Sequence, residues 1–144
     1  MRFGAVAEDK TSELIERIFW STYRGAQYSL NPAQWAALRF FSEHRAGAKT
    51  SSEFAKYHQT TRGTANQTVL ALIRKGYLAR DTSPADHRSK CVSVTREGRE
   101  LLKRDPIRPL LSAIEGLDPT ERRRLENQLA ALYDHLRSLQ QDAA

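Results

Sequence analysis

The sequence predicts a mainly α-helical fold with a small β wing, namely a winged helix-turn-helix with additional helices at both ends. Two short helical patterns separated by a tight turn lie near the middle of the chain. Two short runs of extended character then flank a polar loop, as in a β-hairpin. A leucine repeat of helical period follows near the end. With 144 residues, a single domain over residues 1–144 is expected.

Two helices are expected before the central turn. Residues 11–28 place apolar side chains at spacings of three and four, which gather on one face of a helix. Asn31 followed by Pro32 begins the next helix, because Asn caps free amides and Pro fits the first turn. The buried side of that helix is expected to carry Trp35, Leu38 and Phe41.

Two helices joined by a tight turn come next. Ser51 or Ser52 is the expected cap of the first, which runs to about residue 58 and turns Phe54, Ala55 and Tyr57 inward. Thr61 is the expected cap of the second. Its apolar stripe ends at Gly76, the glycine typical of a helix C-terminus.

A hairpin follows this helix pair. Residues 77–81 and 90–94 are the expected strands, and the polar loop between them contains Pro84. Thr95 then caps another helix. The winged helix-turn-helix, the expected DNA-binding part, therefore covers residues 31–99.

The C-terminal part carries a leucine seam. Pro106 and Pro109 interrupt the helix after the hairpin, and Asp118 with Pro119 begins the last helix. The seam recurs at spacings of four and three, a pattern that pairs helices, and consists of Leu125, Leu129, Leu132, Leu136 and Leu139. With Ile15 and Ile18 it predicts a dimer interface, which makes residues 11–30 and 100–142 dimerisation helices. Ordinary core packing is the alternative.

Positive charge is concentrated in the middle of the chain. The net charge is +6, but residues 56–104 hold 11 basic and four acidic residues, whereas the remainder holds 12 basic and 13 acidic ones. A polyanion such as nucleic acid is the natural partner of this segment. A solvated basic face without a partner is the alternative.

A helix-turn-helix followed by a basic hairpin tip suits double-stranded DNA. The second helix fits the major groove, where Arg pairs with guanine and Asn or Gln with adenine, while the tip can reach the minor groove. The expected DNA-binding residues are Thr61, Arg62, Gly63, Thr64, Asn66, Gln67 and Arg74 on the helix, and Asp86, His87, Arg88, Ser89 and Lys90 at the tip. Phosphate contact alone, or charges that are merely solvated, are the alternatives.

Four segments of the chain resemble the MarR family of bacterial winged-helix regulators. Residues 72–80 (LIRKGYLAR) are similar to the family's passage from recognition helix to wing, and Asp86-His87-Arg88 resembles its Asp-x-Arg signature. Residues 94–98 (VTREG) and 117–121 (LDPTE) resemble the starts of its later helices. The resemblance covers about residues 11–140. This chain departs from the family's pattern in two places. One is the pair Pro106 and Pro109, and the other is the positions of His87 and Ser89, where members of the family commonly have arginines.

The resemblance implies a homodimer with a pocket for small, often phenolic, ligands between the dimerisation and DNA-binding parts. The expected function is a sequence-specific transcription regulator, a repressor that a small aromatic ligand releases from a palindromic operator. A winged-helix module that docks on protein, or a DNA binder without a small-molecule effector, is the alternative. Five aromatic residues are candidates for the ligand pocket, with plain core packing as the alternative: Trp20, Tyr23, Tyr28, Trp35 and Phe40.

Other chemistries have little support in the sequence. The four histidines are scattered without metal-ligand spacing, so no metal and no cofactor is expected. Motifs such as GxSxG or a phosphate loop are missing, which disfavours an enzyme. Cys91 has no activating cation in register, which disfavours a redox sensor. Without a long apolar run or a leader-like N-terminus, a cytoplasmic location is expected.

Overall fold

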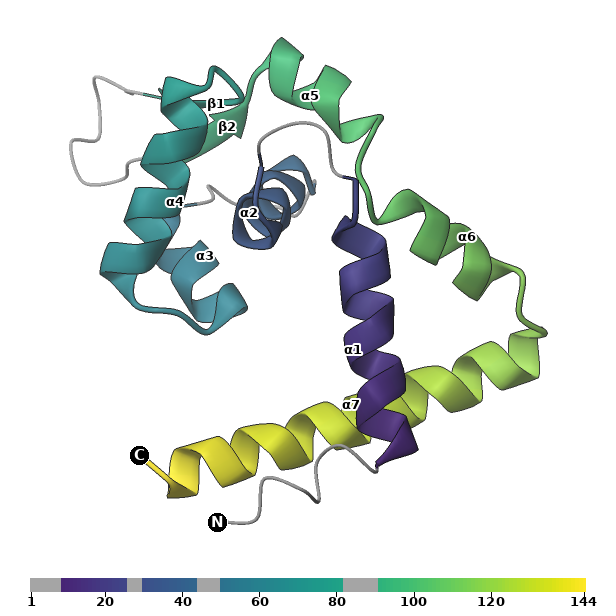
Figure 1. Cartoon of the computed structure of the whole chain (residues 1–144). Helices are drawn as coiled ribbons and strands as arrows, with labels where there is room; N and C mark the ends of the chain where they lie inside the picture. Colours follow the sequence, from purple (N-terminus) through teal and green to yellow (C-terminus); the bar gives the residue numbers. More distant parts are fainter. Residues whose placement is uncertain (1–8, 26–29, 44–49, 82–90) are drawn as a thin grey trace. The chain divides into compact units, whose positions relative to one another are not determined.

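The computed structural model describes residues 9–25, 30–43, 50–81 and 91–144. These residues form mainly helices and a two-stranded antiparallel sheet, so the predicted fold class is confirmed (Figure 1). Contacts divide the chain into two compact units, Met1–Pro106 and Ile107–Ala144. Within the described ranges, every helix is too short or too polar to cross a membrane.

The first unit is built around α2. The elements of this unit are α1 (Lys10–Tyr23), α2 (Pro32–Ser42), α3 (Ser51–His58), α4 (Arg62–Arg74), β1 (Leu78–Asp81), β2 (Cys91–Val94) and α5 (Arg96–Leu102). Helix α2 contacts α3, α4, α5 and β2, and α4 contacts α3 and β1. We call α2 to α5 together with the two strands the winged-helix frame. Its largest fully buried side chains are Trp35, Phe54, Leu38, Leu72, Leu78 and Val69.

Side-chain caps fix where the helices of the frame begin. Oδ1 of Asn31 accepts a hydrogen bond from the backbone N–H of Gln34 at 2.8 Å, and Oε1 of Gln34 accepts one from the backbone N–H of Asn31. Thr61 accepts from the Thr64 amide at 3.1 Å. The predicted caps Asn31 and Thr61 are therefore confirmed. Each satisfies an amide that the first turn of a helix leaves without a partner.

The expected cap of α3 was wrong. Thr50, not Ser51 or Ser52, precedes the helix, and its hydroxyl accepts from the Glu53 amide at 3.2 Å. The Glu53 carboxylate accepts in turn from the Thr50 amide. This reciprocal pair requires a Glu or Gln three residues after the cap, which selects Thr50.

Two further expectations need correction. Helix α1 ends at Tyr23 rather than near residue 28, and Gly25 beyond it takes a φ of 78° that helical residues do not adopt. Tyr57 was expected to face inward, yet it is exposed and its ring packs against Phe40 at the edge of the core.

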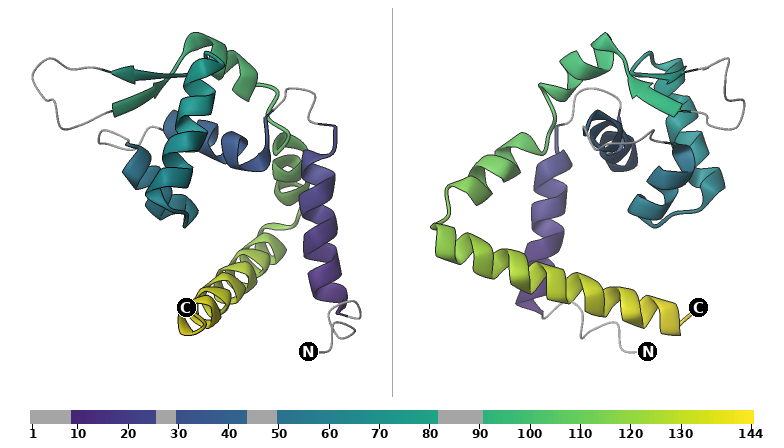
Figure 2. Two further views of the ribbon diagram at one scale, coloured as in Figure 1. Left: turned by 60° about the vertical axis from the view of Figure 1, so that its left-hand side comes forward. Right: turned by 180° about the vertical axis from the view of Figure 1, so that it is seen from behind.

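The two strands form the wing of the frame, an antiparallel pair in which β1 contacts α4 and β2 contacts α2 (Figure 2). Leu78 pairs with Val94 and Arg80 pairs with Val92, so these four residues share a face. Leu78, Val92 and Val94 are buried. Thr95 ties the wing to the frame, because its hydroxyl donates to the Gly76 carbonyl at 2.6 Å and accepts from the Gly98 amide at 3.0 Å.

The second unit consists of α6 (Arg108–Glu115) and α7 (Pro119–Asp142). Helix α5 ends at Leu102, so the expected interruption around Pro106 and Pro109 is confirmed. Asp118 begins α7 by accepting a hydrogen bond from the Thr120 amide at 2.9 Å, as predicted. We call α1, α6 and α7 the terminal helices.

Candidate nucleic-acid interface

The first turns of α4 present a polar surface on a rigid base. Ala65, Val69 and Leu72 of this helix are buried in the frame, which fixes its rotation about its axis. The opposite side exposes Thr61, Arg62, Gly63, Thr64 and Gln67. The structure therefore brings these five predicted residues together at one end of α4.

Two of these residues are partly committed to the helix itself. The Thr61 hydroxyl accepts the Thr64 amide and donates to the Thr64 hydroxyl at 2.9 Å. Arg62 and Gln67 remain exposed with long polar side chains, which suits them to reach a groove floor. The nearest atom to a Cβ at Gly63 would be Oγ1 of Thr61, at 3.9 Å, so the chain itself leaves this backbone accessible to a partner.

Asn66 differs from its neighbours on α4. It is half-buried, and its Oδ1 accepts a hydrogen bond from Nη2 of Arg80 on β1 at 3.1 Å. Nε of Arg80 is buried and has no partner among the described residues. Arg80 is not among the site residues predicted from the sequence. The alternation of side chains along the strand could have identified it, because Arg80 lies two residues after buried Leu78 and therefore faces the same side of the sheet.

The remaining predicted DNA contacts are Arg74 and residues 86–90. Arg74 is exposed in the last turn of α4. Asp86, His87, Arg88, Ser89 and Lys90 lie outside the described residues. The strands that flank them, β1 and β2, are described and carry a further contact between Ser93 and Asp81 at 3.3 Å.

The aromatic residues expected to line a ligand pocket lie in different environments. Trp35 is 0% exposed and belongs to the core, whereas Trp20 is 58% exposed on α1. Tyr23 and Phe40 are half-buried against the edge of the core, and Tyr28 lies outside the described residues. Nε1 of Trp35 is buried without a partner in the described part of the chain.

A buried ion pair, also missed by the sequence analysis, connects three segments of the first unit. Nη1 of Arg39 on α2 contacts Oδ1 of Asp105 at 2.8 Å, and Nη2 of Arg39 donates to the Tyr23 hydroxyl of α1 at 2.8 Å. Asp105 is 5% exposed and the Arg39 side chain 22%. This network joins α1 and α2 to the segment after α5. An arginine within the apolar helix 32–42 was the available signal.

The terminal helices expose large apolar side chains. On α1 these include Ile15 and Ile18, and on α7 they include Leu129, Leu132, Leu136 and Leu139, while Leu125 is partly covered. None of the helices α1, α6 and α7 has a buried residue among those described. The predicted seam therefore forms a continuous apolar stripe along α7.

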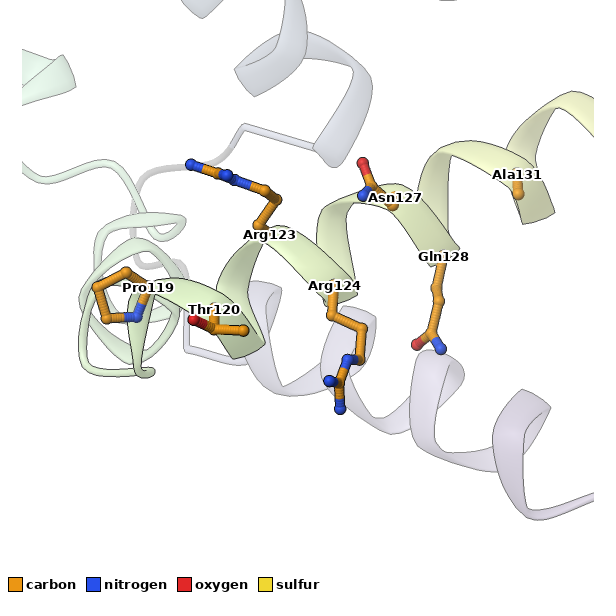
Figure 3. A pocket seen from close by; sticks show the side chains of 7 residues that line it. All are labelled: Pro119, Thr120, Arg123, Arg124, Asn127, Gln128 and Ala131. Atoms are coloured by element: carbon orange, nitrogen blue, oxygen red, sulfur yellow. The ribbon is translucent and has the colours of Figure 1, made fainter.

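A hollow of about 520 Å³ lies along the first half of α7 (Figure 3). Its lining comes from this helix alone and includes Arg123 and Arg124, whose side chains point to different sides in the figure. It includes none of the five aromatic residues expected for a ligand pocket. Elsewhere in the described ranges, His, Cys, Asp and Glu side chains form no group of three that could hold a metal ion.

Part of the first unit matches a known protein family. Residues 28–89 match the model of the MarR family. The chain is similar to S. aureus MepR in its DNA-binding conformation, with 20% identity, a TM-score of 0.73 and coverage of 89% of this chain and 99% of that chain. A search of the curated proteins finds no match.

Two further solved structures are similar at 25% identity. One is CouR, a transcriptional repressor bound to a 23-mer DNA duplex, with a TM-score of 0.69 over 92% of this chain and 98% of that chain. The other is Bordetella bronchiseptica BpsR, whose DNA binding is regulated by 6-hydroxynicotinic acid, with a TM-score of 0.61 over 89% and 95%. Residues 28–89 therefore match the MarR family, and the chain is similar in fold to solved regulators such as MepR and CouR.

Proposed function

We propose that the chain is a sequence-specific DNA-binding transcription repressor that acts as a homodimer and has no catalytic role. The observation that carries this proposal is the exposed polar start of α4, which is held at a fixed angle by a complete core. Such a helix end reads base edges in the major groove. The similarity to CouR, a repressor bound to duplex DNA, supports the same role.

In this proposal, α4 and the wing have separate tasks. Arg62 and Gln67 contact base edges, Thr61 and Thr64 contact the adjoining backbone, and Arg74 contacts phosphate. The wing tip, with Arg88 as its reaching cation, enters the minor groove. The excess of basic residues over positions 56–104 supports this arrangement, because phosphate neutralisation supplies much of the affinity for duplex DNA.

The proposed dimer forms through the terminal helices. Leu132 and Leu136 on α7 and Ile18 on α1 are each more than two-fifths exposed in the single chain. An apolar stripe of this kind requires a covering surface, and a second copy of the chain supplies a self-complementary one. The two α4 helices of such a dimer, related by a twofold axis, then match the two half-sites of a palindromic operator.

We further propose a small aromatic acid as effector, bound near Trp20, Tyr23 and Phe40. The regulation of BpsR by 6-hydroxynicotinic acid supports this ligand class. Tyr23 already contacts Arg39, so an anionic ligand there has a guanidinium within reach. Trp20 provides the readout, since a panel of aromatic acids should change its fluorescence and lower DNA affinity. A panel without effect on either would leave a DNA binder without effector.

The experiment that tests the proposed function is duplex selection followed by a salt titration. The protein should enrich a palindromic sequence from a random duplex pool, and its affinity should fall steeply with salt as counterions are released. Arg62→Gln should reduce both the affinity and the slope, whereas Arg17→Gln on α1 removes the same charge and should change neither. Absence of enrichment, together with a salt-insensitive protein partner, would favour the protein-docking alternative.

A further inference from the structure

The wing and α4 are joined by the hydrogen bond from Arg80 to Asn66. Nη2 of Arg80 lies 3.1 Å from Oδ1 of Asn66. Arg80 pairs with buried Val92 across the wing, and its Nε is buried as well. The aliphatic stem is therefore packed, so the guanidinium has a defined position and its bond to Asn66 costs little additional side-chain entropy.

This bond determines which end of the Asn66 amide faces a partner. A guanidinium has only N–H donors, so the amide must turn its oxygen toward Arg80. Nδ2, which carries two N–H donors, is then directed away from Arg80. Oδ1 retains a second lone pair that can accept a further hydrogen bond. An amide without this neighbour could rotate by 180° and exchange the two ends.

The orientation matters for base readout in the major groove. Adenine offers an acceptor at N7 and a donor at N6, whereas guanine offers acceptors at both N7 and O6. A fixed amide that donates from Nδ2 to N7 places Oδ1 beside the substituent at position 6. That placement forms a second hydrogen bond with adenine and opposes the oxygen of guanine.

We propose that Arg80 is a positioning residue that makes Asn66 select adenine over guanine, a proposal that rests on the DNA-binding function above. Arg80 itself reads no base. It holds the amide of Asn66 in one orientation and thereby links the geometry of the wing to the specificity of α4.

The test compares wild type, Arg80→Met, Asn66→Ala and the double variant on selected duplexes with single adenine-to-guanine changes. Wild type should prefer adenine by about tenfold at one position of each half-site. Each single variant should lose most of this preference, and the double variant should lose no more than either single variant. Arg80→Lys keeps the charge without the planar fork, so it should also lose preference. Arg74→Met, the control, should weaken binding to all duplexes alike.

Asn66→Asp separates positioning from stability. The carboxylate forms a charge-assisted bond to Arg80, so the thermal midpoint should be equal or higher. No N–H remains for N7, which adenine and guanine share, so affinity for both duplexes should fall, while an oxygen beside position 6 should keep adenine preferred. Arg80→Lys keeps the test decisive if Arg80→Met fails to fold. A uniform loss of affinity in Arg80→Met with a salt slope lower by about one would make Arg80 a phosphate contact and overturn the proposal. Additive effects of Arg80→Met and Asn66→Ala on the adenine preference would also overturn the proposal. If the wild-type protein bound no duplex, the proposed DNA-binding function itself would be refuted.

Discussion

The winged-helix frame and the terminal helices use their apolar side chains in opposite ways. The frame buries Trp35, Phe54 and Leu72 completely, whereas α1, α6 and α7 have no buried residue among those described. Yet α7 is the longest helix and carries a regular leucine seam. The frame therefore completes its core within one chain, and the terminal helices leave an apolar surface that is consistent with a second chain. Substitutions in the two regions should have different consequences.

The largest expected effect is on the dimer. Leu136→Lys places a charge in a seam that dimerisation would dehydrate, which should cost on the order of several kcal/mol of association energy. The frame should keep its thermal stability, because Leu136 is exposed in the single chain. Sedimentation equilibrium measures the shift to monomer. Ser138→Lys adds the same charge to α7 outside the seam and should stay dimeric; equal behaviour of the two variants would argue against a seam interface.

A smaller loss is expected inside the first unit, from the ion pair of Arg39 and Asp105. Arg39→Met removes the guanidinium from a carboxylate that is 5% exposed, which should lower the free energy of unfolding by about 3 kcal/mol. Asp105→Asn should cost less, because Arg39 is nearer to water. Urea unfolding measures both. Lys103→Met breaks the exposed pair with Glu100 and should change stability by less than about 1 kcal/mol. If Lys103→Met lowered the free energy of unfolding as much as Arg39→Met, burial of the Arg39–Asp105 pair would not explain the loss.

Glycines give the third contrast. A Cβ on Gly98 would meet the Tyr77 carbonyl oxygen and lie 2.8 Å from Cγ1 of Val94, so Gly98→Ala should destabilise the frame by about 2 kcal/mol. At Gly116, after α6, the nearest atoms lie at 3.5 Å and the φ is −73°, so alanine fits there. Thermal unfolding of both variants tests this difference. A stable Gly98→Ala protein would contradict the close packing of α5 on the wing.

Most of the fold could be predicted because its signals are local. The caps Asn31, Thr61, Thr95 and Asp118 each act within three residues of their own position, and the structure confirms all four. The cap of α3 was wrong because Thr50 competes with two adjacent serines, and only its reciprocal bond with Glu53 decides among them.

The candidate site was less predictable because part of it depends on contacts between distant residues. Asn66 and Arg80 are 14 positions apart, and Arg39 and Asp105 are 66 apart. Helical period and charge identify the exposed start of α4, but they carry no information on which arginine meets which amide. The roles of the wing-tip residues and of the aromatic cluster stay predictions.

The most direct test of the central claim joins both regions in one titration. The protein is added to the selected palindromic duplex and to a duplex in which one half-site is replaced, and stoichiometry and affinity are measured together. The account predicts two chains per intact duplex and about a hundredfold weaker binding when one half-site is lost. The reason is that binding of one α4 helix of the dimer raises the effective concentration of the other at its own half-site. One chain per duplex, with equal affinity for both duplexes, would contradict it.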